Sequence, residues 1–133
     1  MRTQVAIIGG GPAGLLLSQL LLKKGIDTIV LERRTKEYVL ARIRAGVLET
    51  GFAGLMREAG AGERMDREGI LHDGVQIIHE HDSFRIDFKK LTKKHVVVYG
   101  QTEVTRDLYD ARDAAGGTTL FECAGVKPHN IDS

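Results

Sequence analysis

Residues 5–14 read VAIIGGGPAG, and the prediction of the fold starts from this stretch. Its first four residues form a short apolar run rich in branched side chains, which is typical of a strand buried in a parallel sheet. The glycines that follow match the G-x-G-x-x-G pattern of dinucleotide-binding proteins. In that pattern Gly9 permits a tight turn, Gly11 lets the backbone approach a pyrophosphate, and Gly14 lets a helix pack closely on the strand. The stretch therefore predicts a strand, a phosphate-binding turn and the start of a helix.

The next residues complete a βαβ unit. Residues 15–22 are too long and too rich in leucine for another strand, so we expect a helix that Gly25 ends. The N-terminus of that helix offers free N–H groups and a positive dipole end to phosphates. Residues 28–31 form a second apolar run, and Glu32 follows it, 18 residues after Gly14. Because an acid about 20 residues after the glycines accepts hydrogen bonds from a ribose diol, the pattern predicts a dinucleotide site.

The acid narrows the choice of dinucleotide. A carboxylate at Glu32 would repel the 2′-phosphate of NADP, which leaves FAD or NAD for this motif. Arg33 and Arg34 stand beside it, and the sequence leaves two interpretations of these cations open. They either soften the repulsion or are solvated side chains of a loop.

Composition bounds the remaining possibilities. The chain has 133 residues, of which 42% are apolar, so it can bury one modest core and form one domain. Its 19 basic and 18 acidic residues give no electrostatic case for a nucleic-acid partner. No signal-peptide arrangement opens the chain, no apolar run reaches the roughly 18 residues of a membrane span, and Cys123 has no second cysteine to bridge. We therefore expect a cytoplasmic protein with no membrane partner.

Two polar groups of residues are interpreted as structural. His79 and His81 have the spacing of a metal pair, but their polar surroundings favour a hairpin turn, so no metal site is predicted. The lysines within residues 89–94 lack interleaved aromatic side chains, which favours a solvated loop over a nucleic-acid patch.

The chain departs from a plain nucleotide-binding domain after Glu32. An ordinary second βαβ unit would soon bring a third parallel strand, but the next apolar run of the parallel type is 96–99, more than sixty residues on. An insertion is therefore expected between them, with antiparallel strands at 74–78 and 84–88. The other expected elements are a basic loop at 42–46, a helix at about 48–59 ended by Gly60 and Gly62, a helix at 101–115 with Arg106 and Asp107 outward, and strands at 118–123 and near 129–131.

Several stretches make the chain resemble a known family. They are residues 4–9 (QVAIIG) with 11–12 (GP), 39–40 (VL), 42–49 (RIRAGVLE), 57–60 (REAG) and 98–108 (VYGQTEVTRDL). On these motifs the chain resembles the N-terminal third of the p-hydroxybenzoate hydroxylase (4-hydroxybenzoate 3-monooxygenase) family, FAD-dependent aromatic hydroxylases that use NADPH and oxygen. The resemblance implies an α/β fold with a Rossmann-like FAD-binding βαβ unit and a parallel sheet. It also implies an inserted antiparallel segment at about 69–98 that contributes to the substrate-domain sheet.

The resemblance implies roles for individual residues. Arg42, Arg44 and Gln101 would lie along the pyrophosphate and ribityl part of FAD, and the glycine loop and Glu32 would hold its ADP half. In an extended segment residues two apart face the same side, so Arg42 and Arg44 can converge on one diphosphate. The implied cofactor-binding set is Gly9, Gly11, Pro12, Ala13, Gly14, Glu32, Arg33, Arg42, Arg44 and Gln101. Positions associated with NADPH match Arg33, Tyr38 and Arg44, and the outer end of a proton relay that deprotonates the phenol matches His72.

The resemblance is incomplete. The family's second FAD fingerprint, its later Gly-Asp motif and the residues that bind the aromatic acid would fall after Ser133. We therefore expect this chain to supply mainly the ADP-binding part and to be inactive alone. Gly10, Ala13 and Arg34 depart from the family's pattern, and Arg34 could alter the preference for a pyridine nucleotide. The implied activity is hydroxylation of 4-hydroxybenzoate ortho to its phenol by a homodimer. The alternatives are a catalytically inactive fragment that binds FAD or NAD, and another FAD oxidoreductase on the same platform.

Overall fold

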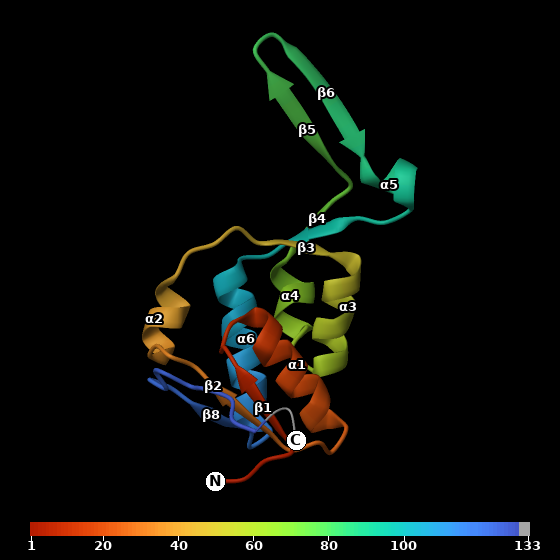
Figure 1. The fold of residues 1–133 in the computed structure, drawn as a ribbon. Helices are drawn as coiled ribbons and strands as arrows, with labels where there is room; N and C mark the ends of the chain where they lie inside the picture. Colours follow the sequence, from red (N-terminus) through yellow and green to blue (C-terminus); the bar gives the residue numbers. More distant parts are fainter. Residues whose placement is uncertain (131–133) are drawn as a thin grey trace.

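A computed structural model describes residues 1–130, and a parallel sheet lies at the base of the molecule (Figure 1). Its strands lie in the order β1-β2-β8. Their bounds are β1 Val5–Ile8, β2 Thr28–Leu31 and β8 Thr118–Leu120. Both pairs are parallel, with Ile7 opposite Val30 and Val30 opposite Thr119. Helix α1 (Pro12–Lys23) connects β1 to β2, so the predicted βαβ unit and the α/β class are confirmed.

Local chemistry sets both ends of α1. Pro12 opens the helix, where its missing N–H costs nothing. At the other end the N–H of Gly25 donates to the carbonyl of Leu22 at 3.0 Å, and the N–H of Ile26 donates to that of Leu21 at 3.1 Å. Gly25 has a φ of +74°, so this is a Schellman motif, and the predicted helix stop is confirmed.

The core lies between α1 and two later helices, α3 (Thr50–Ala59) and α6 (Gln101–Ala114). Leu15 of α1, Met56 of α3 and Leu108 of α6 are fully buried. Burial of each such side chain stabilises the fold by about 1.5–3 kcal/mol. On β1, Ile7 faces this core, but Ile8 is 66% exposed on the other face of the sheet. Within residues 1–130, the expectation of a buried strand therefore holds for one face of β1 and not for the other.

A second, antiparallel sheet lies above the helices (Figure 1). Its strands are β3 Val47–Glu49, β7 Val96–Val98 and β4 Ile70–His72, with β7 in the centre. The expectation that 96–99 supplies the third parallel strand is wrong, since β7 pairs antiparallel with both neighbours and β8 takes that place. An apolar run predicts a central strand but does not predict its direction. The helix expected from Leu48 begins at Thr50, because Leu48 pairs with Val97 in this sheet.

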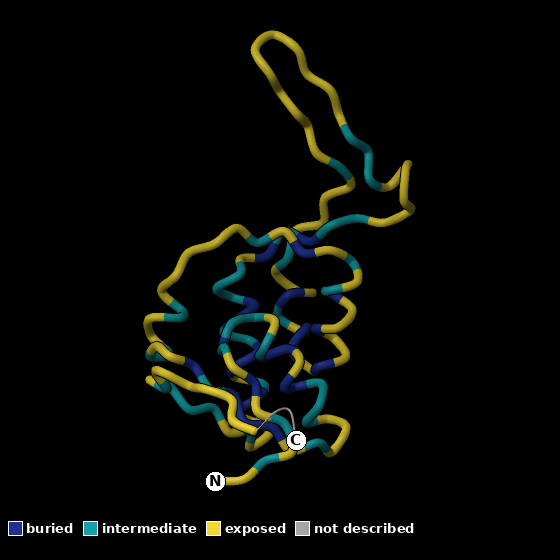
Figure 2. Tube along the Cα trace, viewed as in Figure 1, coloured by how far each residue is buried: buried dark blue, intermediate teal, exposed yellow. Residues whose placement is uncertain are grey.

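The predicted antiparallel strands within the insertion are confirmed as a hairpin, β5 (Gly74–His79) and β6 (Asp82–Asp87), joined by a shorter turn than expected. Figures 1 and 2 show that this hairpin projects away from the helices and is exposed along most of its length. The lysine-rich segment after it is exposed, as expected. It is not a plain loop, however, since α5 (Phe88–Thr92) forms where the Asp87 side chain accepts a hydrogen bond from the Lys90 N–H at 2.8 Å.

Two short helices were not predicted, α2 (Lys36–Ala41) and α4 (Glu63–Glu68). The strand expected at 118–123 ends at Leu120, and Glu122 then has a φ of +58°. Of the strand expected near 129–131, residues 129 and 130 are not in a strand, and Ile131 lies outside the described residues. None of the helices within residues 1–130 is long and apolar enough to cross a membrane.

The outward orientation expected for Asp107 on α6 is wrong. Its carboxylate accepts a hydrogen bond from the Tyr99 hydroxyl at 2.7 Å and lies 3.1 Å from the Arg64 guanidinium. Burial raises the pKa of Asp107, and burial also raises the pKa of Tyr99 to about 12, which keeps the phenol a donor. Arg106 is partly exposed and pairs with Glu103 at 2.6 Å. The sequence of the helix alone did not fix the orientation of Asp107; its two partners, Tyr99 just after β7 and Arg64 on α4, turn it inward.

Candidate functional site

The glycine loop between β1 and α1 has the backbone geometry that its sequence requires. Gly9 has a φ of +115°, which side chains rarely tolerate. A Cβ at Gly14 would collide with the carbonyl oxygen of Gly9, so only glycine lets α1 approach the turn this closely. A Cβ at Gly11 would meet no atom within 4 Å. The space beside Gly11 is therefore open to a ligand.

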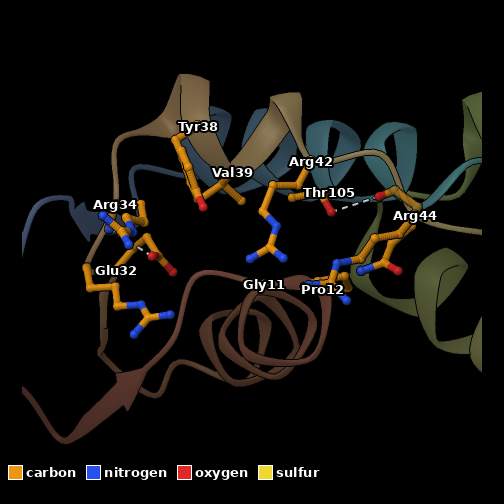
Figure 3. Close-up of a pocket in the computed structure, with 11 residues that line it drawn as sticks. Gly11, Pro12, Glu32, Arg34, Tyr38, Val39, Arg42, Arg44 and Thr105 are labelled. Atoms are coloured by element: carbon orange, nitrogen blue, oxygen red, sulfur yellow. Dashed lines mark hydrogen bonds between the residues drawn. The ribbon is translucent and has the colours of Figure 1, made fainter.

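That space is part of a cavity of about 260 Å³ at the N-terminus of α1 (Figure 3). Its lining comes from α1, the end of β2, α2, the loop after α2, and α6. The lining residues are Gly11, Pro12, Glu32, Arg33, Arg34, Tyr38, Val39, Arg42, Arg44, Gln101 and Thr105. Eight of these were predicted as cofactor-binding or NADPH-associated, so the fold brings together residues from five separate segments.

Positive charge dominates the cavity. Arg42 follows the end of α2 in an extended conformation, with φ −79° and ψ 102°. Its guanidinium points across the cavity toward Gly11, and Arg44 lies beside Pro12 (Figure 3). The lining contains four arginines and one carboxylate, and the positive end of the α1 dipole adds to the positive charge. Forked guanidinium donors and a helix N-terminus are what a diphosphate binds best.

Glu32 is the acid of the cavity and is only 9% exposed. Its Oε2 accepts a hydrogen bond from the Gly10 N–H at 2.8 Å, and its Oε1 accepts one from the Arg34 N–H at 2.9 Å. These two bonds fix the carboxylate at the end of β2. Each oxygen keeps a further lone pair, so both can still accept hydrogen bonds from a diol.

Helix α2 carries an aromatic side chain over the cavity. The Arg34 guanidinium lies 5.0 Å from the centre of the Tyr38 ring, and that of Arg42 lies 5.9 Å from it. The Thr35 hydroxyl caps the helix by accepting from the Tyr38 N–H at 3.1 Å. Arg33 and Arg34 are both exposed and both line the cavity beside Glu32. The two interpretations of these arginines are therefore compatible: their side chains are solvated, and they can also pair with a negatively charged ligand.

A second, more apolar cavity of about 580 Å³ adjoins the first. The two share Pro12 and Gln101. Ala13, which the sequence assigned to the cofactor, lies here, together with Ala45, Val47 and Phe52. The site is thus a charged compartment that continues into an apolar one.

His72 is not brought to either cavity. It is the last residue of β4, an edge strand of the antiparallel sheet, and its side chain is exposed. Besides Arg34, whose role the sequence left open, two lining residues were not predicted, Val39 on α2 and Thr105 on α6. The available signals were Thr35 as a helix cap before 36–41, and the helical spacing of four residues between Gln101 and Thr105.

The βαβ unit, the glycine loop and the arginine-lined cavity define a dinucleotide-binding domain of the Rossmann type. A family model described as "FAD binding domain" matches residues 2–132. The chain belongs to this family of FAD-binding domains.

Two curated relatives refine the comparison. The chain is 47% identical over 132 residues to p-hydroxybenzoate hydroxylase of Acinetobacter baylyi. This alignment covers 98% of the chain and 33% of the relative. It is 34% identical over 86 residues to 6-methylpretetramide 4-monooxygenase of Streptomyces rimosus, covering 65% of the chain and 18% of that protein. The predicted resemblance to the N-terminal third of the hydroxylase family is confirmed.

Solved structures support the fold. PqsL of Pseudomonas aeruginosa, described as a probable FAD-dependent monooxygenase, matches with a TM-score of 0.78 at 19% identity, over 90% of this chain and 33% of that one. The p-nitrophenol 4-monooxygenase PnpA of Pseudomonas putida matches with a TM-score of 0.77 at 19% identity, over 90% and 32%. The chain spans about a third of the length of PqsL, PnpA and the Acinetobacter hydroxylase.

Proposed function

We propose that the full-length protein is an FAD-dependent aromatic monooxygenase that uses NADPH and oxygen to add a hydroxyl group ortho to the phenol of 4-hydroxybenzoate. Residues 1–133 supply mainly the ADP-binding part. The observation that carries the proposal is the arginine-lined cavity at the N-terminus of α1, in a chain 47% identical to a p-hydroxybenzoate hydroxylase.

The residues of the site fit FAD. The open space beside Gly11 admits a pyrophosphate, Arg42 and Arg44 supply charged donors for it, and Glu32 supplies acceptors for a ribose diol. The adjoining apolar cavity at Ala13 suits the less polar part of the cofactor. Bound FAD supplies hydride acceptance and oxygen activation, and the protein supplies binding and orientation.

NADPH use is assigned to Arg33, Tyr38 and Arg44. Tyr38 is 45% exposed and is flanked by guanidinium groups, so a second nucleotide can reach it from solvent. Arg33 and Arg44 line the same cavity and carry the positive charge that a 2′-phosphate requires. These three residues would favour NADPH over NADH.

His72 is proposed as the outer end of a proton relay. Such a group must exchange protons with water, and the exposure of His72 at the end of β4 allows this. An imidazole can both accept and donate a proton, as a shuttle for a phenolic proton requires. The insertion at 69–98 would then contribute β4, the hairpin and β7 to the sheet of the substrate domain.

The test is made on the full-length protein. It should purify as a yellow homodimer, oxidise NADPH faster when 4-hydroxybenzoate is present, and form 3,4-dihydroxybenzoate that chromatography detects. FAD binding without any NADPH oxidation would favour the alternative of a non-catalytic FAD-binding protein. NADPH oxidation without an aromatic product would favour another FAD oxidoreductase.

A further inference from the structure

Tyr109 of α6 is fully buried although it lines neither cavity of the cofactor site. Its hydroxyl donates a hydrogen bond to the carbonyl oxygen of Gly10 at 2.8 Å, across 99 residues of sequence. Burial, together with the negative charge of Glu32, raises the pKa of Tyr109 well above its ordinary value. The phenol therefore stays protonated and remains a donor.

Gly10 is held from both sides. Its N–H donates to Glu32 and its carbonyl accepts from Tyr109, each at 2.8 Å. A Cβ at Gly10 would lie 2.7 Å from the Tyr109 hydroxyl oxygen and 3.0 Å from Cβ of Glu32. The two side chains thus close around this residue and leave room only for glycine.

The hydrogen bond to Gly10 acts on Gly11. The carbonyl of Gly10 and the N–H of Gly11 belong to one planar trans peptide, in which they point in opposite directions. Because Tyr109 draws the carbonyl toward the interior, the Gly11 N–H points away from Tyr109. Gly11 lines the charged cavity, so this donor is set before a ligand arrives.

Tyr109 is itself fixed by its neighbours. Its ring lies 5.6 Å from that of Phe121, at 45°, and the Lys36 ammonium lies 5.2 Å from the ring centre. Lys36 begins α2 and also pairs with Asp113 at 2.9 Å. The phenol thereby joins α6, α2 and the segment after β8 to the glycine loop.

We propose that Tyr109 is a positioning residue of the FAD site, whose hydroxyl orients the Gly10–Gly11 peptide so that the Gly11 N–H binds the pyrophosphate. The inference rests on FAD binding by this domain. It assigns to Tyr109 no contact with the cofactor.

The test compares Tyr109→Phe with Tyr99→Phe in the full-length protein. Each change removes one hydroxyl from a buried tyrosine, but the Tyr99 hydroxyl bonds Asp107, which does not line the cofactor cavities. FAD and ADP affinities of the apoproteins are measured by fluorescence titration, and folding is checked by circular dichroism. Tyr109→Phe should raise both dissociation constants about three- to tenfold, and Tyr99→Phe should leave them within about twofold.

Several outcomes would overturn the inference. These are dissociation constants of Tyr109→Phe within twofold of the parent, an ADP constant that does not change with the FAD constant, or an equal loss in Tyr99→Phe. If Tyr109→Phe does not fold, Phe121→Leu decides. This change removes the ring that packs on the Tyr109 phenol and so loosens the hydrogen bond to Gly10. A dissociation constant for FAD within twofold of the parent's then counts against the proposal. A parent protein that does not bind FAD would end the proposed function as well, which separates the two failures.

Discussion

The Glu32 carboxylate and the Gly10 N–H are joined by a hydrogen bond of 2.8 Å, so the acid at the end of β2 also holds the glycine loop. The sequence pattern assigns such an acid only to the ribose. In the structure its second oxygen accepts from the Arg34 N–H, and the side chain is almost fully buried. Removal of this side chain would therefore affect the ligand and the loop that binds it.

Glu32→Ala should weaken FAD binding by about 1.5–3 kcal/mol, the range for a hydrogen bond to a charged group. Glu32→Gln keeps one oxygen acceptor and should weaken FAD binding less than Glu32→Ala does. Both constants can be measured by calorimetric titration of the full-length apoprotein. A Glu32→Ala protein that binds FAD as tightly as the parent would contradict the assignment, as would a colourless parent that prefers NAD.

Arg42→Ala and Arg44→Ala should each weaken FAD binding by roughly 1.5 kcal/mol, about tenfold in Kd, because each removes a charged donor from the cavity. The FAD affinity of both variants should also depend less on salt concentration than that of the parent. Arg85→Ala is the matched control, since Arg85 lies on the exposed hairpin. An equal effect in all three variants would indicate general electrostatics and not a site.

His72→Asn should leave binding of 4-hydroxybenzoate nearly unchanged while slowing deprotonation of its phenol, because the amide bonds to water but does not titrate. Stopped-flow ultraviolet absorbance after a pH jump follows this ionisation in the full-length protein. His79→Asn changes another exposed histidine, at the end of β5, and should have no effect. If the rate and its pH dependence survive in His72→Asn, the histidine is structural only.

Arg112→Leu should destabilise the fold by about 2–5 kcal/mol. Arg112 is fully buried on α6 and donates to the carbonyls of Thr28 and Thr118 at 2.8 and 2.7 Å, which ties β2 to β8. Leucine would leave both carbonyls without this donor. Urea denaturation of the full-length protein measures the change, with the partly exposed Arg106→Leu as control. Similar midpoints for the two variants would refute the role of the buried guanidinium.

The 133-residue chain expressed alone should retain FAD weakly and form no 3,4-dihydroxybenzoate from FAD, NADPH and 4-hydroxybenzoate, since it spans 33% of its hydroxylase relative. Chromatography of the reaction mixture checks this. Any hydroxylated product above the protein-free blank would show that these residues contain a complete active site.

The βαβ unit and its ends could be predicted from the amino-acid sequence. Gly9 and Gly25 need positive φ, Pro12 opens a helix, and the apolar runs around them have the lengths of strands and a helix. These are local requirements of neighbouring residues, so they can be predicted without the rest of the chain. The family motif at 42–49 also located Arg42 and Arg44 of the cavity, because that stretch carries the resemblance residue by residue.

The contacts between distant segments could not be predicted in this way, because they form only when the whole chain packs. An apolar run at 96–98 fits a strand of either direction, and its pairing with β3 and β4 made it antiparallel. Likewise, no local pattern connects Tyr109 to Gly10, because their hydrogen bond exists only once α6 has packed beside α1. Contacts of this kind depend on which faces the helices bury together. Packing of the whole core determines those faces, so no single stretch of sequence predicts them.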